Sequence, residues 1–240
     1  MKRIVLASFI VLSFVVASDA RAEKATRRHS SDSLAASLLR QAPGLRAEVL
    51  RLALDAAQTA EDRGLVQRRD VITVIDYSLP STQPRLFVFD LIARKLLFRE
   101  LVAHGKNSGD NRTTFFSNSP GSLATSLGLF VTEDTYVGGN GYSLRLRGLE
   151  EGVNDMALDR AIVMHGASYV SRAAIAALGR LGRSWGCPAV RTEVAKKIIN
   201  TVRGGSAVFA YYPEKSWLAT SQFFRKPNAV DANKAGATGS

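Results

Sequence analysis

Hydrophobic residues recur in the first part of the chain with the spacing of helices. From Leu34, the stretches SLAASLLRQA and GLRAEVLRLALDAAQTAEDRG place apolar side chains three or four positions apart, as in amphipathic helices. Pro43 and Gly44 interrupt the pattern and Gly64 follows its end, so we predict two helices. The residues expected on the buried face of the second helix are Leu45, Val49, Leu52, Ala53 and Ala56. We interpret this region as a helical brace packed on the main domain.

After Gly64 the pattern changes to short β-branched and aromatic runs that are broken by Pro, Ser and charged residues. Such runs are typical of strands. The predicted strands lie within residues 71–79, 85–91, 95–101, 126–138, 142–149, 160–167 and 206–212. Helical patterns return only over residues 171–180 and 192–205. We predict a mainly β fold with peripheral helices, because the strands do not alternate regularly with helices as a doubly wound sheet requires.

The N-terminus has the pattern of an export signal. Lys2 and Arg3 precede an almost wholly apolar run from Ile4 to Val16, which is too short to span a membrane. Ala20-Arg21-Ala22 is a small-x-small cleavage site. We therefore predict a signal peptide over residues 1–22 and an exported, soluble mature protein.

The whole chain carries a net charge of +11, which falls to +9 when residues 1–22 are removed. A basic exported protein suits a polyanionic partner such as a cell-wall polymer or an anionic lipid surface. The basic residues are scattered and no nucleic-acid-binding motif is present, so we expect no nucleic-acid partner.

Cys187 is the only cysteine in the chain, so it cannot form an internal disulfide. It is either an inert buried residue, an intermolecular link or a reactive thiol. His165, at the end of a predicted strand, can activate a thiol nucleophile, and Gly186 permits a turn that directs backbone amides at one point. One cysteine and three dispersed histidines offer no metal-ligand spacing, so we expect neither a metal nor a cofactor.

The stretches around these residues resemble the murein L,D-transpeptidase catalytic domain family, with the YkuD-type fold, and specifically its divergent second branch. That family is marked by His-Gly, a spacer and Ser/Thr-His-Gly-Cys; this chain has His165-Gly166 and later Ser184-Trp185-Gly186-Cys187. The resemblance extends over about residues 70–213 and includes AHGKNSG (103–109), FSNSPGSLATSLGLF (116–130) and NDMALDRAIVMHGASYV (154–170). The family's usual His before Gly-Cys is Trp185 here, which leaves the acyl donor open.

The resemblance implies a YkuD-like β-sandwich or barrel and a two-step acyl transfer on peptidoglycan stem peptides. Cys187 would form a thioester, His165 would move the proton, and Ser184 would steady the turn or the histidine. The backbone amides of Gly186 and Cys187 would hold the oxyanion. The residues expected to contact substrate are Arg183, Trp185, His104, Tyr142 and Gly166. A diamino-acid amine of a second stem would resolve the thioester into a cross-link, and carbapenem-type β-lactams would acylate the cysteine.

Two other functions stay open at this point. Water could resolve the same thioester, which would make the protein a hydrolase that trims stems or releases wall-linked protein. Alternatively, the chain could be a non-catalytic cell-wall-binding module. The sequence also leaves the linkage type (3–3 or 1–3) and the oligomeric state open. We divide the chain into a signal peptide (1–22), a polar linker and helical brace (23–65), a catalytic domain (66–215) and a tail (216–240), and we expect it in the periplasm.

Overall fold

The structure is a computed structural model that describes residues 31–224. The predicted signal peptide and the end of the tail lie outside the described residues. Among residues 31–224, no helix combines the length and the hydropathy that a membrane crossing requires.

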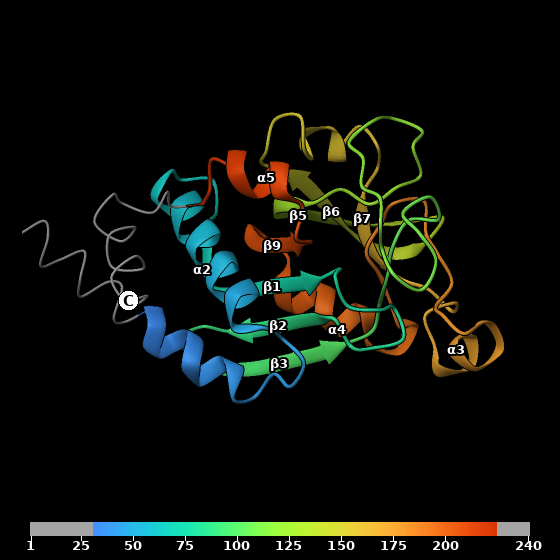
Figure 1. The fold of residues 1–240 in the computed structure, drawn as a ribbon, viewed down its shortest axis with the longest axis horizontal. Helices are drawn as coiled ribbons and strands as arrows, with labels where there is room; N and C mark the ends of the chain where they lie inside the picture. Colours follow the sequence, from blue (N-terminus) through green and yellow to red (C-terminus); the bar gives the residue numbers. More distant parts are fainter. Residues whose placement is uncertain (1–30, 225–240) are drawn as a thin grey trace, which may run out of the picture.

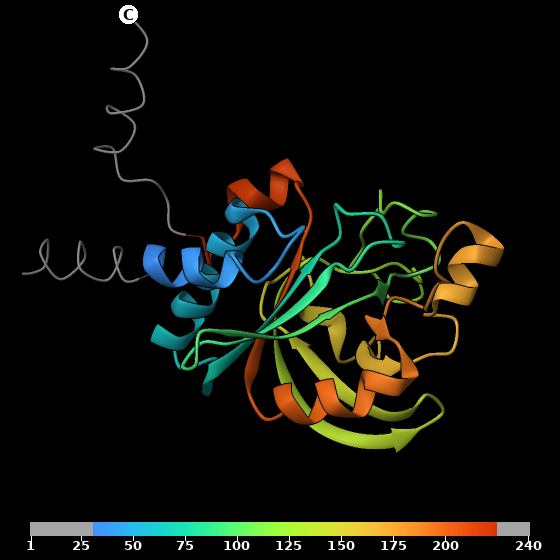
Figure 2. The same cartoon turned by 90° about the horizontal axis from the view of Figure 1, so that it is seen from below.

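The described chain is organised by a sheet that curls into a nearly closed barrel (Figures 1 and 2). In chain order its strands are β1 (Arg68–Asp76), β2 (Leu86–Asp90), β3 (Lys95–Glu100), β4 (Val102–Ala103), β5 (Gly128–Gly138), β6 (Gly141–Gly148), β7 (Val163–Gly166), β8 (Ala189–Val190) and β9 (Ser206–Tyr211). Across the sheet their order is β3-β2-β1-β9-β5-β6-β7-β8-β4. The β1–β9 and β7–β8 pairs are parallel, and the other pairs are antiparallel. The predicted mainly β fold is confirmed.

Helices cover both faces of this sheet. Residues 31–39 are helical, and the other helices are α2 (Ala47–Asp62), the 3₁₀ turn η1 (Asp155–Ala157), α3 (Arg172–Leu178), α4 (Thr192–Val202) and α5 (Lys215–Thr220). Helix α2 packs on one face of the sheet, and α4 packs on the other (Figure 2). The two cores therefore share the sheet as a common wall.

Strand β2 is buried on both faces because it lies between these two cores. Phe87 and Phe89 face the α2 side, and Leu86 and Val88 face the α4 side. The alternation follows from the two-residue period of a strand.

Helix α2 lies where the second N-terminal helix is predicted, and it packs on the sheet. Leu45, just before it, and Val49, Ala53 and Ala56 within it are buried, while Leu52 is half-buried. Helix α5 has no counterpart among the predicted elements, although its Trp217 is buried against the same core.

Candidate active site

Strands β7 and β8 bring His165 and Cys187 onto neighbouring segments of the chain. In the parallel β7–β8 pair, His165 lies opposite Ala189, two residues after Cys187. Cys187 consequently lies beside Val163, whose backbone N–H donates to the Cys187 Sγ at 3.4 Å. Helix α3 lies in the connection between the two strands, so residues that are far apart in the sequence come together at this pair (Figure 1).

The thiol and the imidazole are each bound to backbone in this structure. The Cys187 Sγ donates to the carbonyl oxygen of Ala161 at 3.6 Å. The His165 Nδ1 lies 3.0 Å from the carbonyl oxygen of Gly166. No hydrogen bond between His165 and Cys187 is present among the described residues, and catalytic hydrogen bonds are often absent before substrate binds.

The Gly166 contact defines the tautomer of His165. A carbonyl oxygen only accepts, so Nδ1 carries the proton and Nε2 keeps its lone pair. Burial lowers the pKa of His165, and the Gly166 hydrogen bond opposes that shift. The ring is therefore a neutral base at neutral pH.

The Cys187 side chain is also buried, with 7% of the residue exposed. Burial raises the pKa of the thiol, while the Val163 N–H and the Arg160 guanidinium lower it. Because the thiol pKa is raised and the imidazole pKa is lowered, the resting pair is a neutral thiol and a neutral imidazole rather than a thiolate–imidazolium ion pair.

A compact turn holds Cys187 from its N-terminal side. The Ser184 hydroxyl donates to the Cys187 carbonyl oxygen at 2.7 Å and accepts from the Gly186 N–H at 3.1 Å. Gly186 has φ +121°, and a Cβ there would lie 2.8 Å from the Ala124 carbonyl oxygen. Only glycine fits this position without strain or a clash.

The same turn bears on the predicted oxyanion site. The Gly186 N–H already donates to Ser184, whereas the Cys187 N–H has no acceptor in another described residue. The Cys187 amide is thus the donor beside the sulfur that is free to meet a substrate.

The two predicted aromatic substrate contacts, Trp185 and Tyr142, differ in their surroundings. Trp185 is 73% exposed, although Ser184 and Gly186 on either side of it are buried. Tyr142 lies at the start of β6, next to the turn between β5 and β6. Its hydroxyl donates to Asn200 Oδ1 on α4 at 2.7 Å. Only Trp185 presents a broad unpaired aromatic face.

Arg183 and Gly166 each make contacts within the protein that explain why these residue types occur there. The Arg183 Nη1 donates to the Gly109 carbonyl oxygen at 2.9 Å and lies 3.4 Å from a carboxylate oxygen of Asp110. A Cβ on Gly166 would lie 3.0 Å from the Ala195 Cβ, so the glycine lets α4 pack closely on β7. Arg183 therefore holds the 105–110 loop against the turn that carries the cysteine.

His104 lies beneath the site rather than at its surface. It is 1% exposed, its Nδ1 accepts from Arg85 Nη2 at 2.7 Å, and its Nε2 faces the Gly109 carbonyl oxygen at 3.4 Å. Burial and the positive charge of Arg85 lower the pKa of His104 to about 4. This geometry gives His104 no exposed atom for a substrate and makes it a support of the loops.

Arg85 is a buried cation that sequence reasoning did not single out. All five of its N–H donors are satisfied: Nε and Nη2 donate to Val102, Nη1 donates to Leu79 and Thr113, and Nη2 also donates to His104. Burial lowers its pKa to about 10, so it stays charged at neutral pH. The sign of a buried arginine that the sequence offers is its place directly before a hydrophobic strand.

Arg160 is the second residue that the sequence reasoning missed. It lies five positions before His165 and interacts electrostatically with the Cys187 thiol. Its guanidinium bonds to the 117–126 loop, which also contacts Gly186 through Thr125. The sequence placed it only within the stretch that carries the family resemblance.

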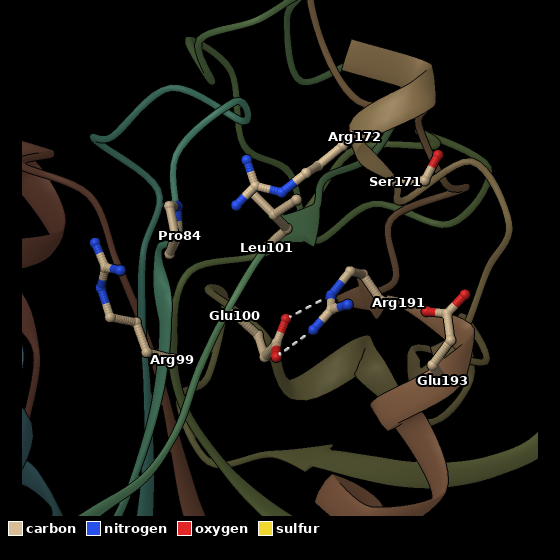
Figure 3. A pocket seen from close by; sticks show the side chains of 8 residues that line it. All are labelled: Pro84, Arg99, Glu100, Leu101, Ser171, Arg172, Arg191 and Glu193. Carbon is tan, nitrogen blue, oxygen red and sulfur yellow. Dashed lines mark hydrogen bonds and ion pairs between the residues drawn. The ribbon is translucent and has the colours of Figure 1, made fainter. Parts of the chain in front are cut away.

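A cavity of about 420 Å³ lies beside Arg191, the residue that follows β8 (Figure 3). It is lined by Pro84, Arg99, Glu100, Leu101, Ser171, Arg172, Arg191 and Glu193. Arg191 and Glu100 form a two-pronged ion pair at 2.7 and 2.8 Å. Neither Cys187 nor His165 lines this cavity, which separates it from the thiol.

The chain offers no arrangement for a metal within residues 31–224. No group of three or more His, Cys, Asp or Glu side chains in the described chain could hold a metal ion.

Comparison with known families places this site in context. The sequence profile of a family described as the L,D-transpeptidase catalytic domain matches residues 41–211. No protein with a curated description matches the chain.

Several solved structures are similar to this chain at low identity. An L,D-transpeptidase from Mycobacterium smegmatis is 13% identical with a TM-score of 0.38, over 60% of this chain and 59% of that one. An L,D-transpeptidase from Stackebrandtia nassauensis is 14% identical with a TM-score of 0.37, over 77% of this chain and 91% of that one. The helical cell shape determining protein Pgp2 from Campylobacter jejuni is 15% identical with a TM-score of 0.40, over 68% of this chain and 57% of that one. The chain thus spans less than two thirds of the Mycobacterium smegmatis protein.

Proposed function

Because this chain belongs to the L,D-transpeptidase catalytic domain family, whose profile covers residues 41–211, we propose that it is a cysteine L,D-transpeptidase of peptidoglycan. The observation that carries the proposal is the placement of the chain's sole cysteine beside β7, two register positions from His165. The substrates are stem peptides, one as acyl donor and one as amine acceptor. The predicted signal peptide supports action outside the cytoplasm, in the periplasm.

The first half of the reaction acylates the enzyme. Nε2 of His165 takes the proton from the Cys187 Sγ, and the sulfur attacks a peptide carbonyl of the donor stem. The Cys187 N–H stabilises the oxyanion that forms. His165 then returns the proton to the leaving amine, and the donor acyl group remains as a thioester on Cys187.

The second half transfers the acyl group. The side-chain amine of a diamino acid on a second stem attacks the thioester and loses a proton to His165. The C–S bond breaks, the proton returns to the sulfur, and a new amide bond joins the two stems. The exposed indole of Trp185 offers a stacking face beside the nucleophile for one of the two peptides.

The test is product analysis by mass spectrometry with purified disaccharide tetrapeptides and pentapeptides. We expect the wild-type protein to give cross-linked dimers and a transient acyl adduct on the intact protein. Cys187→Ala is expected to give neither while keeping the wild-type circular dichroism and melting temperature. Cys187→Ser is the matched control, because it keeps the size of the side chain and replaces the thiol by a much weaker nucleophile.

Other products would decide between functions that use the same fold. Shortened monomers without dimers would show that water resolves the thioester and that the protein is a hydrolase. Dimer formation by Cys187→Ala at the wild-type rate would overturn the proposal. Binding to cell-wall sacculi without any adduct or product would favour a non-catalytic module.

A further inference from the structure

Arg160 holds a positive charge that no carboxylate of the described residues neutralises within ion-pair distance. Its Nη1 donates to the carbonyl oxygen of Ser117 at 2.7 Å and to the hydroxyl of Ser126. Its Nη2 donates to the hydroxyl of Ser122 at 3.2 Å and to the carbonyl oxygen of Ala124. All four acceptors are neutral, so they orient the guanidinium without cancelling its charge.

The guanidinium is held against the turn that carries the nucleophile. A Cβ added to Gly186 would lie 3.3 Å from Arg160 Nη2, which places that nitrogen against the residue before Cys187. On the other side, Arg160 directly precedes Ala161, whose carbonyl oxygen accepts from the thiol. Gly186, against which the guanidinium lies, and Ala161, which follows Arg160 in the chain, are thus both next to the sulfur.

The remaining titratable groups around the sulfur do not supply a positive charge. Tyr77 and Tyr169 both interact with Cys187, and burial raises the pKa of each, that of Tyr169 to about 12. They stay neutral across the working pH range. His165 is neutral at rest, and the Arg85 guanidinium lies over the Tyr77 ring, 5.0 Å from its centroid, and bonds to His104 rather than to the sulfur.

We propose that Arg160 is the electrostatic partner of the Cys187 thiolate: it stabilises the negative charge that forms on the sulfur when His165 removes the proton. The buried sulfur has lost most of its hydration, so a fixed cation replaces solvent in stabilising that charge. Arg160 achieves this only because the 117–126 loop fixes it in place. The proposal deepens the proposed function, on which it rests for the identity of the reaction.

The test measures the ionisation of the thiol without any peptidoglycan substrate. Cys187 is the only cysteine in the chain, so iodoacetamide alkylation followed by intact mass reports that thiol alone. The rate is measured from pH 6 to pH 11 in wild type, Arg160→Gln, Arg160→Lys and Arg172→Gln. Arg172→Gln is the matched control, because it removes one positive charge from an exposed position on α3.

We expect Arg160→Gln to move the alkylation midpoint upward by about one to three pH units, which lowers the rate at pH 7 about tenfold or more. Arg172→Gln is expected to match wild type, and Arg160→Lys to stay within about half a unit of it because the charge is kept. A midpoint in Arg160→Gln equal to that of Arg172→Gln would overturn the proposal. If Arg160→Gln does not fold, Arg160→Lys decides: a rise of one unit or more in the folded Lys variant contradicts the proposal.

This readout is independent of the transferase reaction. If the alkylation midpoint shifts as expected but no product forms from any stem peptide, the proposed function fails and the role of Arg160 in thiol ionisation stands. If product forms but the midpoint does not shift, the role of Arg160 fails and the proposed function stands.

Discussion

The hydroxyl of Ser184 donates a hydrogen bond of 2.7 Å to the carbonyl oxygen of Cys187. The same oxygen atom of Ser184 accepts the N–H of Gly186 at 3.1 Å, so one side chain closes the turn from both ends. Because the bonds run to backbone atoms, Ser184 acts on the direction of the nucleophile and its amide rather than on the sulfur itself.

Replacing Ser184 by Ala is expected to lower kcat about tenfold to a hundredfold, because small displacements of a nucleophile lose its alignment with the substrate carbonyl. Ser184→Thr keeps the hydroxyl and should recover most of the rate. Steady-state cross-linking kinetics measure both variants. A Ser184→Ala enzyme with the wild-type kcat would show that the turn does not need this hydroxyl.

The neutral resting pair predicts the pH dependence of acyl transfer. Burial lowers the pKa of His165, so the base stays unprotonated down to below its ordinary value of about 6.5. We expect kcat/KM to fall when the pH drops below about 6.5. We do not expect kcat/KM to stay constant at acidic pH, as it does for a thiolate–imidazolium pair. His165→Asn should lose most activity, and its residual rate should increase with pH as the thiol ionises. An acid limb centred above pH 7 in wild type would contradict a neutral, buried imidazole.

His104 predicts a pH dependence of stability that is separate from catalysis. Its pKa is about 4 in the folded protein and about 6.5 in an unfolded chain, so the unfolded state binds the proton first as the pH falls. Stability is complete above about pH 6.5 and declines between there and about pH 4, by up to roughly 3 kcal/mol from this group.

The measurement is the free energy of unfolding in urea at pH 7 and pH 4. His104→Asn places an amide oxygen near the Nδ1 position, where it can accept from Arg85, and it removes the titrating ring. The variant should lose less stability than wild type between the two pH values. An equal loss in both proteins would remove His104 as the cause.

A hydrogen bond of Trp217, which lies in the core on the α2 side of the sheet, leads to a prediction about the free energy of unfolding. Its Nε1 donates to Glu150 Oε2 at 2.9 Å, while the other carboxylate oxygen accepts from the Leu129 N–H at 2.7 Å. Trp217→Phe keeps an aromatic ring but leaves one buried carboxylate oxygen without its donor, which should lower the free energy of unfolding by about 1–3 kcal/mol. Trp185→Phe is the control, since that exposed indole should leave stability unchanged. A Trp217→Phe protein as stable as the control would contradict this account.

Much of the fold follows from local pattern. The predicted strand around Val88, the predicted helix around Val49 and the predicted strands within residues 126–138 and 142–149 all depend on residue spacing within a few positions. These signals survive because each element buries the face that its own sequence makes apolar. The two-residue strands β4 and β8 were not predictable in this way, because they exist only through their pairing with each other and with β7.

The candidate site could also be predicted in part from the sequence. Cys187 and His165 could be named because their chemistry is distinctive, and the family resemblance singled them out. Arg160 and Arg85 could not be, since scattered arginines look alike in a basic chain and only the fold reveals which ones lose their solvent. His104 shows the converse: the family resemblance of its stretch suggested a substrate contact, but the fold places both ring nitrogens against Arg85 and Gly109.

Trp185 projects from the nucleophile turn between two buried neighbours, Ser184 and Gly186. The exposed side chain of this turn is thus distinct from the buried residues whose hydrogen bonds hold its backbone. A substitution at residue 185 is therefore expected to change the exposed surface of this turn while the bonds that Ser184 makes to Gly186 and Cys187 stay intact.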